Sequence, residues 1–197
     1  WGAGVSTIAA ILGHMGSSAV AANSVAQVVR QLATVVAFGV SSTTAILIGK
    51  AIGEGKLETA KEYGKRFRKL SIITGIAGAV VVLLARPIVM TAFTLSEESR
   101  YYLGVMMLVM SYFVIGQSYN TTLVVGIFRG GGDTLFGLIL DVSIMWGISI
   151  AFGAVGAFFL DFSVPLVYII LLSDEVIKIP ITTWRYRTYR WLQNVTR

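Results

Sequence analysis

The chain alternates long apolar segments with connectors whose charge changes from one to the next. The connector Lys56–Lys69 is strongly basic, Leu95–Arg100 carries two Glu and one Arg, and Trp184–Arg197 is basic again. In proteins with several membrane-spanning helices, Lys and Arg concentrate in the connectors that face the cytoplasm. The alternation therefore predicts a multi-pass membrane protein and also indicates the side on which each connector lies.

The composition agrees with a chain that lies in lipid. Apolar residues make up 55% of the 197 residues and charged residues 13%, and the mean hydropathy is +0.77. Soluble domains carry about 25% charged residues. We therefore expect an all-α membrane protein. A transmembrane β-barrel does not fit, because continuous apolar runs such as Ala79–Leu84 lack the alternation that barrel strands need.

The apolar runs predict six helical segments. They cover about residues 1–12, 19–49, 70–93, 102–128, 135–160 and 164–184, and a basic tail follows over 185–197. Spanning a bilayer takes about 20 helical residues, so we expect five complete spans and the end of a truncated first helix. We expect Arg86-Pro87 to kink or end the third segment. If the basic connectors are cytoplasmic, the C-terminal tail is cytoplasmic too.

The positive charge of the chain has a membrane explanation. The net charge is +6, with one His and no Cys, and the basic residues gather on one predicted side. That distribution favours contact with anionic lipid headgroups over nucleic acid. Without Cys and with a single His, the sequence offers no disulfide, no His-rich metal site and no nucleophile–base pair. We expect neither an enzyme nor a cofactor.

Polar side chains within the predicted spans are candidates for function, because burying them in lipid is costly. Asp141 could carry a proton or a cation, or it could pair with Arg30. Glu175 and Lys178 can neutralise each other at i, i+3, and Asp174 can reach Lys178 at i, i+4. The possible ion-coupling residues are Asp141 and Asp174.

A second group of polar residues predicts either a substrate path or an interhelical hydrogen-bond seam. Both readings place these side chains toward protein or a cavity and away from lipid. The predicted substrate-binding and cavity-lining residues are Asn23, Gln27, Arg30, Tyr119, Asn120 and Asp141.

The sharpest local motif is the glycine-rich turn Arg129–Thr134. Its glycines end one helix, and Asp133 or Thr134 caps the next. A phosphate-binding loop is the alternative, but no strand precedes the turn and no Walker Lys follows it. The residues predicted to shape this conformational motif are Arg129, Gly130, Gly132, Asp133 and Thr134.

This turn resembles the Leu-Arg-Gly-x-Gly-Asp-Thr signature of the multidrug and toxic compound extrusion (MATE) family, with Phe128 in place of Leu. Two further stretches are similar to the family pattern: Gly13-x-x-Gly16 followed by Ala21-Ala22-Asn23, and Gly49-x-x-x-Gly53-x-Gly55 with Ala60. The resemblance covers nearly the whole chain. It implies one membrane domain, residues 1–197, that forms the second six-helix lobe of a two-lobe secondary transporter, with a missing N-terminal lobe before Trp1.

The resemblance implies an antiporter that exports organic cations, drugs or other xenobiotics by alternating access. The coupling ion would be Na⁺ or H⁺, and no other cofactor is implied. The expected partners are a drug-like organic cation, membrane lipid and the N-terminal lobe. Some family members place a coupling carboxylate before the glycine-rich turn, whereas residues 117–122 contain none, so a coupling site in the other lobe stays open. The alternative functions are a lipid-linked oligosaccharide flippase of the same superfamily and a non-transporting membrane scaffold.

Overall fold

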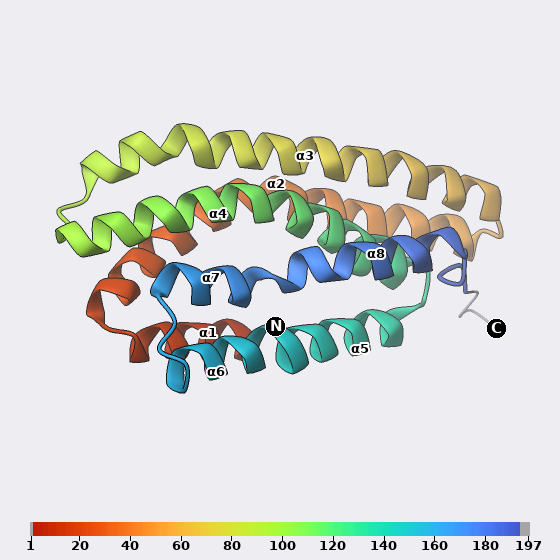
Figure 1. Cartoon of the computed structure of the whole chain (residues 1–197). Helices are drawn as coiled ribbons and strands as arrows, with labels where there is room; N and C mark the ends of the chain where they lie inside the picture. Colours follow the sequence, from red (N-terminus) through yellow and green to blue (C-terminus); the bar gives the residue numbers. More distant parts are fainter. Residues whose placement is uncertain (1, 194–197) are drawn as a thin grey trace.

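The structure, a computed structural model that describes residues 2–193, is built of long helices that run back and forth (Figure 1). The first half of the chain forms α1 (Gly2–His14), α2 (Ser17–Gly53), α3 (Leu57–Ala92) and α4 (Glu97–Thr121). α4 continues without a turn into the π-helix η1 (Thr122–Phe128).

The second half begins after the glycine-rich turn and contains two interruptions of regular helix. The segments are α5 (Thr134–Ile144), the π-helix η2 (Met145–Ile150), α6 (Ala151–Phe158), α7 (Val164–Leu172) and α8 (Asp174–Arg187). α5, η2 and α6 form one continuous rod. α7 and α8 are separated at Ser173.

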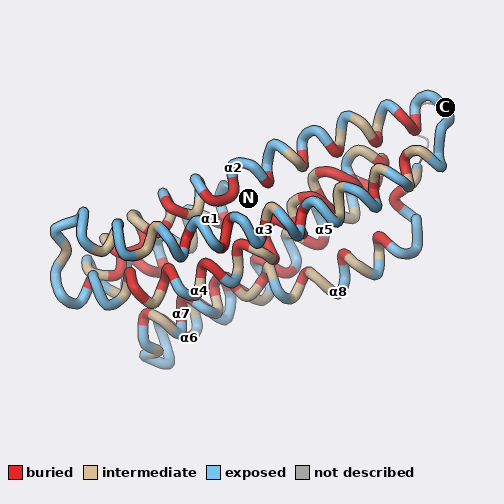
Figure 2. The backbone as a smooth tube through the Cα atoms, turned by 90° about the horizontal axis from the view of Figure 1, so that it is seen from above, coloured by how far each residue is buried: buried red, intermediate tan, exposed pale blue. Residues whose placement is uncertain are grey.

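The helices lie in layers, with the α7–α8 segment in the middle (Figure 1). α3 is on one outer side, where it packs on α2 and α4, and α1, α5 and α6 are on the opposite side. Along each helix, buried residues alternate with exposed ones, so the helices present exposed outer faces (Figure 2). Exposed Ile, Leu, Val and Phe side chains are abundant on these faces, as expected for a protein surrounded by lipid.

The all-α membrane fold is confirmed. Within the described residues, four helical stretches are long and apolar enough to cross a membrane: Ser17–Gly53, Leu57–Ala92, Glu97–Phe128 and Thr134–Phe158. The prediction of five complete spans differs from this result at the segment 164–184. The break at Ser173 divides that segment into helices of 9 and 14 residues.

The basic connector predicted over 56–69 is wrong from Leu57 onward, because α3 begins there. Its charges stabilise the helix through the ion pairs Lys61–Glu58 and Arg66–Glu62, at i, i+3 and i, i+4. Of the two outcomes expected at Arg86-Pro87, an end of the helix is wrong, since α3 continues to Ala92 with Pro87 inside it, and a kink stays a prediction. A proline removes one helical hydrogen bond, which a helix in lipid tolerates when its neighbours compensate.

Small residues bring the helices of the first half close together. A side chain at Gly78 would place its Cβ 2.8 Å from the carbonyl oxygen of Ala33 on α2, and one at Gly75 would lie 3.0 Å from Ile115 Cα on α4. Interfaces between helices in membranes rely on such small residues. Gly75 and Gly78 therefore give α3 a packing face toward α4 and α2.

The predicted tail 185–197 is ordered as far as the structure describes it. α8 extends to Arg187, and the chain then folds back so that Trp191 is fully buried. The Trp191 Nε1 donates a hydrogen bond to the Tyr186 carbonyl at 3.1 Å. Trp1, in the predicted first segment, and residues 194–197, in the predicted tail, lie outside the described residues.

Candidate functional site

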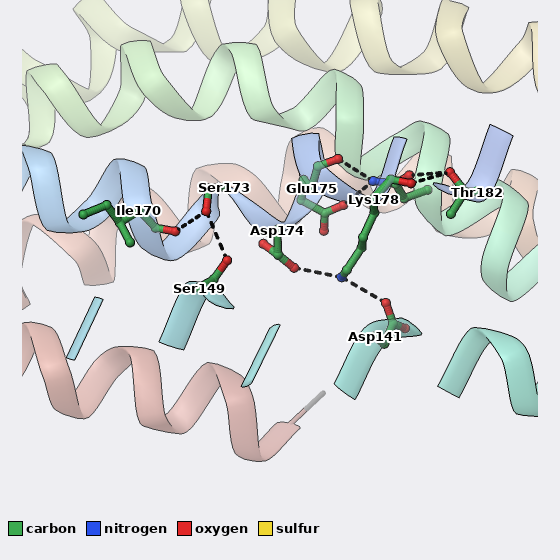
Figure 3. Close-up of polar contacts among 9 residues, drawn as sticks. Asp141, Ser149, Ile170, Ser173, Asp174, Glu175, Lys178 and Thr182 are labelled. Atoms are coloured by element: carbon green, nitrogen blue, oxygen red, sulfur yellow. Dashed lines mark hydrogen bonds and ion pairs between the residues drawn. The ribbon is translucent and has the colours of Figure 1, made fainter. Parts of the chain in front are cut away.

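The centre of the bundle holds a cluster of ionisable side chains from α5 and α8 (Figure 3). The ammonium of Lys178 lies 2.8 Å from Asp174 Oδ2 and 2.9 Å from Asp141 Oδ1. The side chains of Lys178 and Asp174 are 6% and 11% exposed, whereas that of Asp141 is 40% exposed. Lys178 therefore joins one enclosed carboxylate on its own helix to a more accessible one on another.

Glu175 takes a different partner from the one predicted. Of the two acids expected to reach Lys178, Asp174 forms an ion pair with the ammonium from one helical turn away, whereas no ion pair within 4 Å joins Glu175 to Lys178 among the described residues. Glu175 instead accepts a hydrogen bond from Asn120 Nδ2 at 2.9 Å, and the same amide donates to the Glu175 carbonyl at 2.6 Å. The other amide atom, Asn120 Oδ1, accepts from Thr182 at 3.2 Å. Asn120 thus fastens α4 to α8.

The alternative pairing of Asp141 with Arg30 is also not what the structure contains. Asp141 faces Lys178, and Arg30 lines a small cavity of about 30 Å³ beside Gln117, Asp174 and Glu175. The Lys178 ammonium thus faces the carboxylates of Asp141 and Asp174. The Glu175 carboxylate is instead held by the Asn120 amide. Among the described residues, no group of three or more His, Cys, Asp or Glu is arranged to hold a metal ion.

The helices that carry the cluster are interrupted next to it. η1 begins directly after Thr121, η2 begins after Ile144, and the α7–α8 break at Ser173 precedes Asp174. At this break, the Ser173 hydroxyl donates to the Ile170 carbonyl at 2.6 Å and lies 3.2 Å from the Ser149 hydroxyl of η2 (Figure 3). Irregular helices within a membrane occur where they are buried in protein or line a cavity, and π-helical turns are frequent at functional sites.

Two larger cavities meet at this cluster. The first, of about 160 Å³, is lined by polar groups that include Asn120, Asp141, Glu175 and Lys178. The second, of about 420 Å³, lies along η1, α5 and η2 and shares Asp141 with the first. Arg129, which is exposed, also lines both. Asp141 is therefore the carboxylate of the cluster that both cavities reach.

The glycine-rich turn is held by the C-terminal segment. Asp133 occupies the N-cap position of α5, but its side chain makes no capping hydrogen bond, so the predicted capping role is wrong. Both of its carboxylate oxygens instead accept from Arg185, at 2.7 and 2.9 Å. The Gly131 carbonyl accepts from the Gln193 amide at 2.9 Å. A bidentate Arg–carboxylate pair is stronger than a single cap bond, which explains why this pairing wins.

Glycine is required at three positions of this turn. Gly132 has a φ of 90°, in the left-handed region that glycine adopts without strain. A Cβ at Gly131 would meet the Trp191 carbonyl oxygen. Gly130 approaches the Ala45 carbonyl of α2 with similar closeness. Thr134 begins α5 and lines the 420 Å³ cavity.

The remaining predicted site residues lie apart from the cluster. Asn23 is buried in α2, and its Oδ1 has no hydrogen-bond partner among the described residues. Gln27 is half-buried one turn further along α2. The Tyr119 hydroxyl lies 2.9 Å from the Thr183 hydroxyl of α8. The structure thus brings Asn120, Asp141 and Asp174 together with Lys178, whereas the roles of Asn23, Gln27 and Tyr119 as cavity residues stay predictions.

Sequence reasoning missed the central position of Lys178 and the part that Glu175, Gln117 and Thr182 play around it. The contact between Asp174 and Lys178, which the i, i+4 spacing predicted, is confirmed. The contact to Asp141 had no local signal, because it depends on how α5 and α8 pack. Thr182 is fully buried, and because it lies one turn after Lys178, helical periodicity places it on the same side of α8.

Comparison with known proteins places this geometry in context. The family model described as MatE matches residues 6–155. The chain is 27% identical over 162 residues to "Uncharacterized transporter YisQ" of Bacillus subtilis, covering 78% of this chain and 34% of that protein. It is 24% identical over 177 residues to "Probable multidrug resistance protein NorM" of Xylella fastidiosa, covering 90% of this chain and 38% of that protein.

A solved structure shares the fold. A MOP superfamily transporter from Pyrococcus furiosus superposes with a TM-score of 0.83 at 18% sequence identity, over 95% of this chain and 42% of that one. The chain spans between about a third and two fifths of the length of these relatives, a fraction consistent with one lobe of a two-lobe transporter.

Proposed function

The chain belongs to the MatE family, and on this basis we propose that it works as the C-terminal lobe of a cation-coupled antiporter. Such a protein exports drug-like organic cations or other xenobiotics by alternating access, in exchange for Na⁺ or H⁺. Similarity to a protein named as a probable multidrug resistance protein supports this substrate class. The other lobe is the required partner within the full-length protein.

The observation that carries the proposal is the ionisable cluster on interrupted helices. Asp141, Asp174, Glu175 and Lys178 line cavities in the middle of a membrane bundle. Ionisable residues at membrane depth mark ion and substrate paths, and discontinuous helices form such sites in secondary transporters. The cluster therefore supports a transport role for this lobe.

Within the cluster, Asp141 is the preferred ion-coupling residue. Its side chain is 40% exposed, and it lines both the 160 and the 420 Å³ cavities. An ion in either cavity can reach this carboxylate, whereas Glu175 lines only the 160 Å³ cavity of these two. Asp174 is more enclosed, at 11% side-chain exposure, and borders only the 30 Å³ cavity among the three. We therefore rank Asp174 after Asp141 as an ion-coupling residue.

The flippase alternative receives less support from this arrangement. A flippase for a lipid-linked oligosaccharide needs free cations to hold a pyrophosphate. Lys178 is held by two carboxylates at 2.8 and 2.9 Å, so its charge is already neutralised. A scaffold without transport activity would have no use for cavities that reach buried ionisable groups.

The transport proposal is tested with the full-length protein in liposomes. A fluorescent organic cation such as ethidium is the substrate, and Na⁺ and pH gradients are imposed separately. The expected result is accumulation of ethidium against its gradient when one of the two ion gradients is present, and none when both are absent. Absence of accumulation under either gradient would refute the proposal for this substrate class.

We also propose that the protein lies in the cell membrane, with the C-terminus and the basic stretch Lys56–Lys69 on the cytoplasmic side. This chain has no Cys, so a single cysteine introduced into it reports sidedness once any cysteine of the other lobe has been replaced. Lys56→Cys is expected to react with an impermeant maleimide only after the cells are opened. Arg100→Cys, at the opposite end of the bundle, is expected to react in intact cells. The reverse pattern would invert the orientation.

A further inference from the structure

We propose that the turn of α3 formed by Lys65, Arg68 and Lys69 binds the phosphate of an anionic phospholipid, whose acyl chains lie along the apolar face that follows on the same helix. The inference rests on the membrane location of the bundle and is independent of transport. It identifies a lipid partner that differs from the exported substrate in chemistry and in place.

The cations of this turn are not neutralised by the protein. Lys56, Lys61 and Arg66 are each paired with a Glu nearby: Glu54, Glu58 and Glu62. The Lys56 ammonium holds the pKa of the Glu54 carboxyl below its usual value, mainly through their hydrogen bond. In contrast, none of Lys65, Arg68 and Lys69 lies within 4 Å of a carboxylate among the described residues.

These three cations lie at the level where the helix enters the lipid. Lys69 lies four positions after Lys65, which is about 6 Å along the helix axis. Leu70 follows immediately and begins an exposed apolar stretch. The headgroup phosphates of a bilayer lie at this boundary between charged and apolar surface.

An apolar face for the acyl chains continues directly from the cations. Residues seven apart lie on nearly the same side of a helix, so Lys65 is above Ile72 and Lys69 is above Ile76. Ile72, Ile76 and Val80 are 42%, 50% and 47% exposed. One side of α3 thus presents cations followed by branched apolar side chains. This order matches a phospholipid, in which a charged phosphate is followed by apolar acyl chains.

The position of α3 in the bundle leaves this face open. α3 is on the outer side of α2 and α4 (Figure 1). Only 22% of the apolar stretch within α3 is buried, compared with 56% of the corresponding stretch within Glu97–Phe128. α3 also lies on the opposite side of the bundle from α5, which carries Asp141 (Figure 1). The proposed lipid therefore does not compete with the ionisable cluster.

The C-terminal segment holds the turn in place. The Arg68 guanidinium lies 5.2 Å from the ring centre of Tyr186, within the range of a cation–π interaction. A Cβ at Gly64 would lie 3.4 Å from the rings of Tyr186 and Trp191, so α3 packs closely against this segment. A cation that packing already orders loses less conformational entropy when it binds a phosphate. The geometry thus favours a defined site over diffuse attraction to the membrane.

The test measures lipid binding to the purified full-length protein without any ion gradient. Phosphatidylglycerol and phosphatidylcholine with identical acyl chains are titrated, and retained lipid is counted by native mass spectrometry. A cation near an anionic membrane surface contributes about a five-fold preference, so three predict a preference of order 100-fold for phosphatidylglycerol. The triple variant Lys65→Gln/Arg68→Gln/Lys69→Gln is expected to lose this preference.

Two further variants keep the result interpretable. Lys65→Gln/Lys69→Gln changes only exposed side chains, so it preserves the Arg68–Tyr186 packing and is expected to weaken phosphatidylglycerol binding roughly 25-fold. The matched control Lys56→Gln/Lys61→Gln/Arg66→Gln removes the same charge from acid-paired positions and is expected to bind as the wild type does. Unchanged binding by the double variant, or an equal loss in the control, would overturn the proposal. Neither outcome bears on ethidium transport.

Discussion

Lys178 of α8 reaches Asp141 of α5 at 2.9 Å, across a stretch of sequence that contains η2, α6 and α7. The same ammonium contacts Asp174 on its own helix at 2.8 Å. α5 and α8 are therefore joined by a charge contact within the part of the bundle where the helices are interrupted. The cation-coupled role that we propose for this lobe depends on that contact.

Removing the ammonium should destabilise the lobe strongly. Lys178→Met leaves Asp174 enclosed without its cation, and breaking a buried ion pair from one side costs about 3–5 kcal/mol. We expect a loss of the free energy of unfolding toward that range, measured by denaturant titration in detergent micelles. Lys65→Met, which removes an exposed and unpaired ammonium, should change it by less than about 0.5 kcal/mol. Equal effects of both variants would contradict the enclosed pair.

The double variant Lys178→Met/Asp174→Asn separates charge from packing. It removes the enclosed ammonium together with the enclosed carboxylate, so the uncompensated charge disappears. We expect it to unfold at a higher denaturant concentration than Lys178→Met alone. A double variant that is no more stable than Lys178→Met would show that the uncompensated Asp174 carboxylate is not what destabilises the single variant.

The glycine-rich turn should loosen when its bidentate contact is lost. Arg185→Lys replaces two hydrogen bonds to Asp133 by at most one point-charge contact, and a hydrogen bond to a charged group is worth about 1.5–3 kcal/mol. We expect faster amide hydrogen exchange over residues 129–134 and 188–193. Arg187→Lys, at an exposed position of the same helix, serves as the control. Unchanged exchange in Arg185→Lys would show that the Trp191 packing alone holds the turn.

Close helix packing makes Gly78 sensitive to any side chain. Gly78→Ala places a methyl group 2.8 Å from the Ala33 carbonyl oxygen, and overpacking of this kind costs about 1–3 kcal/mol. Gly39→Ala meets nothing within 4 Å and should be neutral or stabilising by up to about 1 kcal/mol, because Ala favours helix over Gly. Thermal unfolding in detergent distinguishes the two. A Gly78→Ala variant that melts with the wild type would contradict the tight α2–α3 contact.

Much of the architecture was predictable because it depends on local sequence. Long apolar runs predict spans, and the close approach at Gly75 and Gly78 follows from small residues within such a run. The beginning of α3 at Leu57 was missed because its charges were interpreted as a connector. Lys61 and Arg66 each pair with a Glu on the same helix, a pattern that is equally typical of a solvated helix.

The interruptions of the helices could not be predicted. Neither a Pro nor a Gly occurs at Ser173, where α7 and α8 separate. η1 and η2 each contain one glycine, Gly126 and Gly147, but Gly is too frequent in membrane helices to predict such an interruption. These features arise from tertiary packing, as does the choice of Asp141 over Glu175 as the second partner of Lys178. For the same reason, Asn23 and Asn120 were both predicted to line the substrate cavity, whereas only Asn120 lies at the ionisable cluster around Lys178.

The most direct test of the central claim is the ion coupling of Asp141→Asn in the full-length protein. Ethidium accumulation in liposomes is measured under the ion gradient that drives the wild type, with Asp161→Asn as the matched control in the exposed connector between α6 and α7. We predict that Asp141→Asn loses at least about ten-fold in gradient-driven accumulation, which corresponds to about 1.4 kcal/mol, whereas Asp161→Asn keeps it. Equal gradient-driven accumulation in both variants and the wild type would contradict a coupling role for this carboxylate.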